Sequence, residues 1–420
     1  MVFRVVARAC GLACGWLLAS SIVVAAPPST ALESELAQAV REAWSAHPAE
    51  EATERTLAAA QARATASGRP LYNPELEVAV DDEGDERTTT AGLAWTMDVS
   101  GKRRARAALG QANLTLSEAE AAQRRTQFVL SWLQAWADRL AAAERVRVGA
   151  QRLTLVERFA DLAERQRAVG DISSLERDLA LLARDEAQAE QASLLSEAAT
   201  ADEAFRAVGG IATEALVAPD VPPTLPLESV RLDTVADARV AAASAAATSS
   251  QIAVSQRDRR PDPTLRLTTG RIDLGPTSDN VLGVAVSVPL FVRNTYRAEV
   301  VAAQADADAA LAEQRRVELE VEARAERAQR TYAAVRDAWT RWSQSPGTDV
   351  DKRADLLERL WRAGELSTAD YLIQLKQSLD TALAGAELQG RLWRSYVDAL
   401  YATGQLDAWA GFPTLSEVTP

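Results

Sequence analysis

The sequence predicts a mainly helical protein with a small β part, built as two similar halves that each contain helices and a β-hairpin. Three observations support this fold class. The 420 residues contain only 20 Gly and 16 Pro, clustered at a few points, so long helices are expected. Apolar residues alternate with polar or small ones in two pairs of short segments, which indicates strands. Landmarks of the first half recur in the second half at a nearly constant offset.

Residues 1–26 have the organisation of a secretory signal peptide. Basic residues precede an apolar stretch, and Val-Ala-Ala at 24–26 provides a small-residue cleavage pattern. An uncleaved anchor is one alternative. A lipoprotein is another, because Cys10 and Cys14 are present, but apolar sequence continues past Cys14, whereas a lipidated cysteine normally closes the apolar region. Cleavage would remove both cysteines, so no internal disulfide is expected in the mature chain.

The chain is acidic, with a formal net charge of −13, and residues 1–26 contribute two arginines but no acidic residue. A protein of this kind lacks the surplus of Lys and Arg that nucleic-acid binding requires, so no nucleic-acid partner is expected. After the N-terminal segment, no stretch supplies the roughly 20 apolar residues of a membrane helix. The best stretch, residues 282–292, contains Gly and Pro. The mature chain is therefore expected either to be soluble or to cross a membrane as strands.

Matching landmarks divide the chain into two repeats. Gly170 matches Gly364, 194 residues later, and each is expected at the tip turn between two long helices. Residues 73–76 (Asn-Pro-Glu-Leu) match residues 262–265 (Asp-Pro-Thr-Leu) at an offset of 189. A nearly constant offset between separate landmarks predicts a duplicated fold.

The expected domain boundaries follow from this duplication. The first repeat is predicted over residues 27–218 and the second over residues 228–404. Four prolines within residues 219–227 exclude a helix there and indicate an extended linker. Residues 405–420 are left as a C-terminal tail.

The two predicted strand pairs lie at about residues 75–99 and 264–290. In each pair apolar side chains alternate with polar or small ones, which is typical of a membrane β-barrel wall. The alternative is a soluble two-stranded ribbon packed on helices. If the strands cross a membrane, the apolar face meets lipid. The residues assigned to that face are Leu93, Trp95, Met97, Val286 and Val288.

Four strands are too few to close a barrel, because single-chain bacterial barrels have at least about eight. An open sheet edge in lipid would leave backbone groups without hydrogen bonds. Strands that cross a membrane here would therefore require several copies of the chain to share one barrel.

The remaining sequence predicts long helices that pack side by side. Residues 102–168 contain no proline and predict a helix on the order of 100 Å long. Apolar residues recur at spacings of four and three in both halves, as in a coiled coil. An ordinary helical bundle explains these stripes equally well, but it leaves their attachment to barrel-like strands unexplained.

No catalytic, metal or cofactor site is expected. His47 is the only histidine, and it is expected at the surface or at a helix end. Without a cluster of His and Cys, a zinc or copper site of the usual kind is excluded. Gly101-Lys102 is followed by Arg103 where a phosphate loop requires Ser or Thr. The sequence therefore indicates a protein that is neither an enzyme nor dependent on a cofactor.

The whole arrangement resembles the TolC-like outer-membrane factor family. The signal peptide, the duplicated halves, the Pro-rich joint and the Gly turns occur in the family's order across essentially the whole mature chain. Gly-Lys-Arg at 101–103, Pro-Leu-Phe-Val-Arg-Asn at 289–294 and the position of Pro346 are similar to the heavy-metal efflux (CzcC-like) branch. Further matching segments are residues 73–76, 261–263 and 362–367.

The resemblance implies a location in the outer membrane of a Gram-negative bacterium, with the helices in the periplasm. It implies a homotrimer in which four strands per chain contribute to a trimeric 12-stranded membrane β-barrel, and the coiled-coil helices form a tunnel. It also implies a passive export duct, here for heavy-metal cations, in a tripartite efflux system. The expected partners are outer-membrane lipid, a periplasmic adaptor protein and an inner-membrane resistance-nodulation-division pump.

The resemblance further implies a pore gate at the tunnel tip. Asp370, six residues after Gly364, occupies the position of a pore-lining aspartate in the family, and the repeat places Glu176 equivalently. A ring of carboxylates favours cations. The alternative is that both are ordinary exposed helix acids. For the chain as a whole, the alternatives are a drug or protein export channel of the same fold and a soluble periplasmic coiled-coil scaffold.

Overall fold

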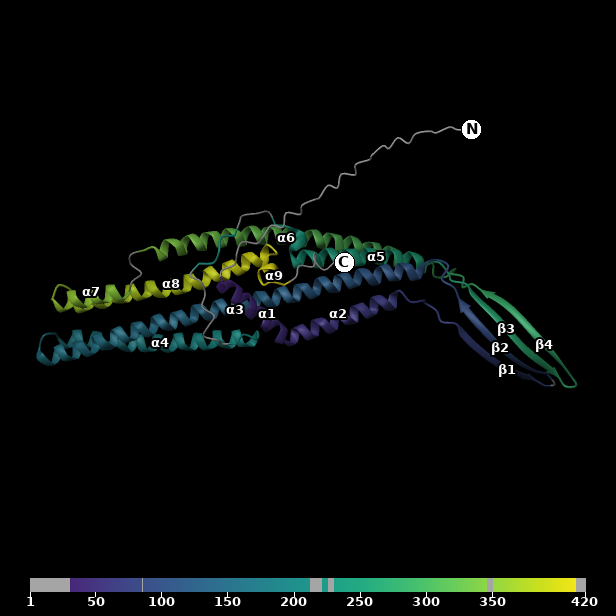
Figure 1. The fold of residues 1–420 in the computed structure, drawn as a ribbon, viewed down its shortest axis with the longest axis horizontal. Helices are drawn as coiled ribbons and strands as arrows, with labels where there is room; N and C mark the ends of the chain where they lie inside the picture. The colour runs from purple at the N-terminus through teal and green to yellow at the C-terminus, as the bar shows by residue number, and fades with distance from the viewer. Residues whose placement is uncertain (1–30, 85, 212–220, 226–229, 346–349, 413–420) are drawn as a thin grey trace, which may run out of the picture.

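The computed structural model describes residues 31–84, 86–211, 221–225, 230–345 and 350–412. The molecule is elongated, with a four-stranded sheet at one end and two helical hairpins at the other (Figure 1). This is the mainly helical architecture with a small β part that the sequence predicts. Among the helices of these residues, none has the length and apolar character needed to cross a membrane. The predicted signal peptide lies outside the described residues.

The first repeat contains a broken helix, a β-hairpin and a long helical hairpin. Its elements are α1 (Ala31–Ala46), α2 (Pro48–Ser67), β1 (Glu75–Glu83), β2 (Glu86–Thr96), α3 (Lys102–Val169) and α4 (Ser174–Ala207). His47 separates α1 from α2, and its Nδ1 accepts the N–H of Ala49 at 3.1 Å, which caps α2. The expectation of a helix-end position for His47 is thus confirmed.

The second repeat has the same order of elements, with the break in its long helix instead of its first. Its elements are η1 (Leu232–Thr234), α5 (Ala236–Asp258), β3 (Thr264–Leu274), β4 (Thr277–Ser287), α6 (Arg297–Ser343), α7 (Val350–Arg362), α8 (Thr368–Ala402) and α9 (Leu406–Trp409). Pro346, expected at the break, lies outside the described residues. Residues 405–412 are more than a tail, because Leu406 and Ala410 are fully buried in the main core.

The sheet joins the two repeats. Its strands follow the order β1-β2-β3-β4, and every neighbouring pair is antiparallel. β2 ends at Thr96 and β4 at Ser287, slightly before the predicted ends at 99 and 290. The N–H of Met97 still donates to the oxygen of Pro263, but proline has no N–H to continue the ladder. Pro289 limits β4 in the same way.

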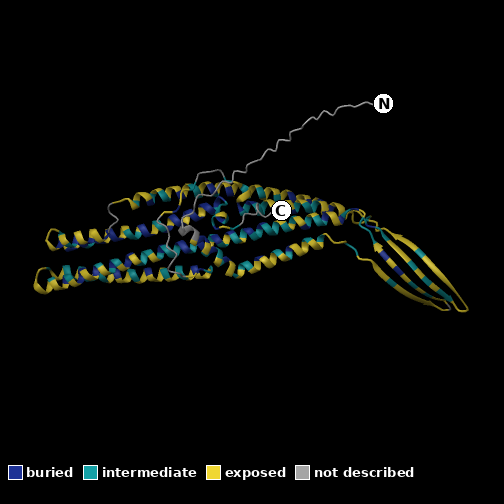
Figure 2. Ribbon diagram, viewed as in Figure 1, coloured by how far each residue is buried: buried dark blue, intermediate teal, exposed yellow. Residues whose placement is uncertain are grey.

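Two large apolar cores and one small one stabilise the helical part, and buried residues run along its inner surfaces (Figure 2). The main core lies at mid-length between α1, α3, α4, α6, α8 and α9. Its largest members include Trp132, Trp136, Trp393 and Tyr396. The second core lies between the two hairpins, α3 with α4 and α7 with α8, and includes Phe159, Trp361 and Tyr371. Both large cores contain residues from both repeats, so the halves are packed into one body.

Candidate functional site

The sheet has one apolar face, and most of that face is exposed. In an antiparallel sheet, residues paired across strands and every second residue along a strand share a face. Trp95 pairs with Leu265, which pairs with Val286, and Leu93 lies in the next row with Leu267 and Val284. The apolar members are Leu76, Val78 and Val80 on β1, Leu93 and Trp95 on β2, Leu265 and Leu267 on β3, and Leu282, Val284 and Val286 on β4.

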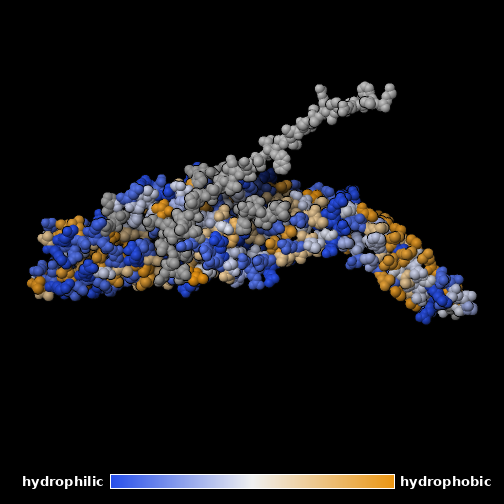
Figure 3. All heavy atoms as spheres, viewed as in Figure 1, coloured by the Kyte–Doolittle hydropathy of each residue, from blue (hydrophilic) through white to orange (hydrophobic). Residues whose placement is uncertain are grey.

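Most of this apolar face is uncovered, and the exposed fractions reach 77% at Leu76 and 68% at Val284. A patch of this size is unusual on a soluble monomer and indicates a contact with lipid or another chain. Figure 3 shows the apolar residues over the part of the sheet nearest the helices, with hydrophilic residues at its far end. Met97 and Val288, also assigned to this face, lie just beyond the ends of β2 and β4.

The opposite face of the sheet is polar and built from small residues. Gly92, Gly270 and Gly283 all lie on it, and a Cβ at Gly270 would come within 2.4 Å of the Thr89 carbonyl oxygen. Arg266 on β3 forms an ion pair with Glu77 on β1, reaching across β2 where Gly92 occupies little space. Small side chains let the strands bend toward this face, as they do on the inner side of a barrel.

Both edges of the sheet are open. Within the described residues β1 pairs only with β2, and β4 pairs only with β3. Each edge strand therefore presents a row of backbone N–H and C=O groups that can pair with another strand. In a lipid environment these groups must be paired, so the single chain is incomplete as a membrane-spanning structure.

The junction between the sheet and the helices is built around a buried ion pair. Lys102 Nζ lies 2.9 Å from Asp262 Oδ2, and both side chains are almost fully buried. The hydroxyl of Tyr72 donates to the same carboxylate oxygen at 3.0 Å. Burial and this hydrogen bond raise the pKa of Tyr72 to about 12. Residues 101–103 (Gly-Lys-Arg) of the first repeat thus contact residues 261–263 (Pro-Asp-Pro) of the second repeat.

Asp98 caps the start of α3 from four residues upstream. Its two oxygens accept the N–H groups of Lys102 at 2.9 Å and Arg103 at 2.7 Å. Burial opposes ionisation of this carboxyl, but four backbone N–H groups outweigh it and lower the pKa of Asp98. Gly101 has φ 75°, which favours glycine and turns the chain from the strand into the helix.

The two tip turns lie at the end of the molecule opposite the sheet (Figure 1). Gly170 (φ 88°) ends α3, and Gly364 (φ 74°) follows α7, so both turns use the left-handed conformation that glycine adopts readily. The positions predicted for the tip turns are therefore turns between antiparallel helices in the structure.

Glu176 and Asp370 occupy equivalent places next to these turns. Each is the third residue of its helix, and a serine three residues earlier caps that helix: Ser173 for α4 and Ser367 for α8. Glu176 Oε2 accepts the backbone N–H of Ser173 at 2.8 Å, and the Ser367 hydroxyl donates to Asp370 Oδ2 at 2.6 Å. Both acids were identified by their position six residues after a glycine. The same position is the third residue of a capped helix, so a capping role also explains it.

A hydrogen-bonded link connects the two tips. The indole N–H of Trp361 donates to the Thr368 hydroxyl at 3.1 Å, and that hydroxyl donates to Glu176 Oε1 at 3.4 Å. The pKa of Glu176 is lowered first by the Ser173 backbone N–H, then by the Ser173 hydroxyl and last by Thr368. Sequence reasoning missed this link. The Ser-x-x-Glu and Ser-x-x-Asp capping patterns were visible, but the cross-repeat partner Thr368 carries no local signal.

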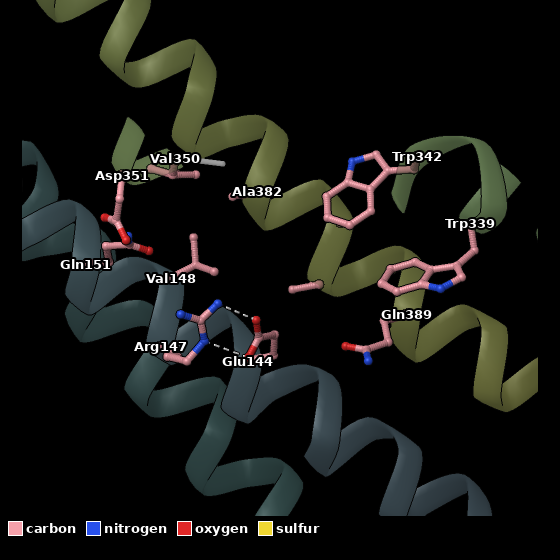
Figure 4. A pocket seen from close by; sticks show the side chains of 12 residues that line it. Glu144, Arg147, Val148, Gln151, Trp339, Trp342, Val350, Asp351, Ala382 and Gln389 are labelled. Atoms are coloured by element: carbon pink, nitrogen blue, oxygen red, sulfur yellow. Dashed lines mark hydrogen bonds and ion pairs between the residues drawn. The ribbon is translucent and has the colours of Figure 1, made fainter. Parts of the chain in front are cut away.

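A pocket of about 370 Å³ lies beside the break between α6 and α7. Figure 4 places the rings of Trp339 and Trp342 at one end of it, and Gln151 with Asp351 at the other. The Trp342 ring packs on Gly385, where a Cβ would come within 2.0 Å of the ring. The sequence predicts apolar stripes along the long helices, but it does not predict this pocket. In the part of the chain that the structure describes, no group of three or more His, Cys, Asp and Glu could hold a metal ion.

Comparison with known proteins finds similarity to a metal-resistance protein and to outer-membrane channels. No protein-family model matches the sequence. The cobalt-zinc-cadmium resistance protein CzcC of Cupriavidus metallidurans is 28% identical over 234 residues, covering 54% of this chain and 56% of CzcC. The match thus spans little more than half of that relative.

Solved structures match nearly the whole chain. The outer membrane protein VceC of Vibrio cholerae superposes with a TM-score of 0.70 at 18% identity, over 88% of this chain and 96% of VceC. CusC, whose structures concern folding and transmembrane channel formation, gives a TM-score of 0.73 at 13% identity, over 88% and 91% of the two chains. The chain therefore has the fold of the TolC-like outer-membrane factors.

Proposed function

We propose that the chain is the outer-membrane channel subunit of a tripartite efflux system and that its duct exports heavy-metal cations. The observation that carries the proposal is the four-stranded sheet, which has an exposed apolar face and two open edges and continues into helices on the order of 100 Å long. A soluble scaffold has no use for such a face. An export duct needs a wall in the membrane and a long passage beneath it.

Three copies would complete the wall. β1 and β4 run in opposite directions, so β4 of one copy beside β1 of the next continues the antiparallel alternation. Four strands from each of three copies give a barrel of 12 strands, within the range of outer-membrane barrels. In this arrangement Leu93, Trp95, Met97, Val286 and Val288 face lipid, and the small-residue face lines the lumen.

The helical hairpins would form the periplasmic tunnel, with Glu176 and Asp370 at its narrow end. Both acids lie next to the tip turns, far from the sheet. Three-fold symmetry would gather up to six carboxylates around one axis, which favours cations. Capping hydrogen bonds hold each carboxylate in place, and the link through Thr368 ties Glu176 to the second hairpin.

The cargo and the partners follow from the relatives. CzcC is named for resistance to cobalt, zinc and cadmium, and cations of this kind are the proposed substrates here. A periplasmic adaptor and an inner-membrane resistance-nodulation-division pump would supply the cations to the duct. No feature of the described residues favours a drug or protein cargo instead.

The test combines assembly, conductance and resistance. The protein purified from outer membranes should have three times the chain mass in detergent and should form cation-selective channels in planar bilayers. Deletion of its gene should sensitise the bacterium to cobalt, zinc or cadmium. A monomer in the soluble periplasmic fraction would show that the chain is a scaffold, and sensitivity to drugs alone would assign a different cargo.

The gate is tested by Glu176→Gln with Asp370→Asn. The matched control is Glu54→Gln with Glu203→Gln, two exposed acids outside the tips with the same loss of charge. We expect the tip pair to weaken cation selectivity and divalent block, and the control pair to leave both unchanged. Unchanged selectivity in the tip pair would place the gate elsewhere without affecting the proposed channel.

A further inference from the structure

A second candidate site lies where the sheet meets the helices. A pocket of about 900 Å³ opens there, between the segments on either side of β1 and β2 and the first turn of α3. Its lining combines the aromatic and apolar side chains of Tyr72, Trp95 and Met97 with the guanidinium groups of Arg103, Arg104 and Arg257. We propose that this pocket binds the anionic headgroup of a phospholipid whose acyl chains lie on the apolar face of the sheet. This inference rests on the proposed position of the sheet in a membrane.

Positive charge gathers at this junction although the chain as a whole carries a net charge of −13. Within the described residues, none of the arginines at the ends of the segments that enter and leave the sheet forms a salt bridge. They are Arg69, Arg103, Arg104, Arg106, Arg257, Arg259, Arg260, Arg293 and Arg297. An arginine near an anionic membrane surface contributes about 1 kcal/mol of binding free energy, so such a belt favours anionic over neutral lipid.

The carboxylates of Asp98, in the pocket lining, and of the nearby Asp262 already have partners. Asp98 accepts the N–H groups of Lys102 and Arg103, and Asp262 is buried against Lys102. The side chains of Arg103 and Arg104, by contrast, are exposed on the first turn of α3. Arg257 donates one N–H to the carbonyl oxygen of Ser100 at 2.9 Å, which fixes its position and leaves its other donors available. A phosphate matches these groups because guanidinium forms paired hydrogen bonds with it.

The apolar part of the lining favours a phospholipid over free phosphate. Trp95 belongs both to the pocket and to the apolar face of the sheet, and its side chain is 54% exposed. Val99, also in the lining, is 64% exposed. The pocket thus continues onto a surface that suits acyl chains, and Figure 3 shows apolar and hydrophilic residues meeting at this level of the molecule. Free phosphate would use only the arginines, whereas a phospholipid uses both surfaces.

The experiment measures lipid binding to the purified full chain by native mass spectrometry in detergent. Phosphatidylglycerol and phosphatidylcholine with identical acyl chains are titrated separately. The test variant is Arg103→Gln with Arg104→Gln. The matched control is Arg315→Gln with Arg353→Gln, two exposed arginines on α6 and α7 without a salt bridge among the described residues.

We expect phosphatidylglycerol to bind more tightly than phosphatidylcholine, and the test variant to weaken that binding by about five-fold per arginine. The control variant should bind as the wild type does. Excess inorganic phosphate should displace little of the lipid, because it lacks acyl chains.

Equal binding of the two lipids, or equal losses in the test and control variants, would overturn the inference. Bilayer conductance of the same preparations separates this failure from failure of the proposed function. Channels of normal conductance without a lipid preference would refute only the lipid site. A protein that forms no channel would refute the proposed function itself.

Discussion

The ring of Tyr371 on α8 stacks on the ring of Phe159 on α3, with centroids 4.2 Å apart and planes 22° from parallel. The contact joins the two repeats near the tip turns, and both side chains are buried. Burial, reinforced by the charge of Glu358, raises the pKa of Tyr371 to about 12. The folded tip therefore prefers the neutral phenol.

This preference predicts alkaline weakening of the tip. An unfolded tyrosine has a pKa of about 10, below the folded value, so the contribution of Tyr371 is fully present below pH 10 and is lost as pH rises through about 12. The free energies of unfolding of the wild type and Tyr371→Phe should differ by a constant amount below pH 10, and above it the wild type should lose stability relative to the variant. Titration of Tyr371 near pH 10, measured as the difference in ultraviolet absorbance between the wild type and Tyr371→Phe, would contradict this expectation.

The Lys102–Asp262 pair predicts a large loss of stability when one partner is removed. Asp262→Asn leaves the ammonium of Lys102 buried without its counter-ion, which costs about 3–5 kcal/mol. Lys102→Met combined with Asp262→Leu should cost less than the single change, because no unpaired charge remains. Denaturant unfolding of the single and double variants measures the difference, and additive effects would show that the two charges are not coupled.

Gly385 predicts a specific steric effect at the pocket beside α6. A Cβ at this position would overlap the ring of Trp342, so Gly385→Ala should displace the indole and cost about 1–3 kcal/mol. Gly68→Ala is the matched control, since the nearest atom to its added Cβ lies 3.5 Å away. Thermal unfolding and tryptophan fluorescence measure both effects. Equal stabilities of the two variants would show that the Trp342 contact is loose.

The apolar face predicts a difference between neighbouring positions on one strand. Val286→Arg puts a charge on the face assigned to lipid and should destabilise the folded barrel by about 2–4 kcal/mol near mid-bilayer. Ser287→Arg, on the opposite face of the same strand, should be much milder. Yield and heat stability of the protein in outer-membrane fractions compare the two. Normal insertion of Val286→Arg would indicate that this face does not meet lipid.

Much of the fold was predictable because its signals are local and periodic. Alternation over residues 282–290 marks a strand wherever it occurs, and the glycines at 170 and 364 mark turns because glycine adopts positive φ readily. The domain boundaries drawn from the repeat remain predictions. The stabilising role of residues 405–412 was missed because their contacts are to distant helices, such as the ion pair of Asp407 with Arg125.

The candidate sites were less predictable because they depend on contacts between repeats. Lys102 and Asp262 each belong to a recognisable segment, but nothing local shows that the two segments meet. Glu176 was selected for its distance from Gly170, while its contact with Thr368 depends on how the two hairpins pack. Periodicity identifies the faces of an element, and only packing identifies their partners.

The open edges give the most direct test of the central claim, which is that copies of the chain complete one barrel. Within a chain, β1 and β4 are three strand spacings apart, about 14 Å, so cysteines placed on them cannot form an internal disulfide. Val78→Cys on β1 is combined in turn with Leu282→Cys, Val284→Cys or Val286→Cys on β4. The three combinations sample different registers between β1 of one copy and β4 of the next, all on the apolar face. Ala285→Cys, on the opposite face, replaces the second cysteine in the control.

The measurement is a non-reducing gel of each oxidised double variant, prepared from outer membranes without the two cysteines at positions 10 and 14. The account predicts that at least one of the three same-face combinations gives a covalent trimer and no larger species, and that the control gives none. Monomers in every combination, or a ladder extending beyond three chains, would contradict a closed three-chain barrel.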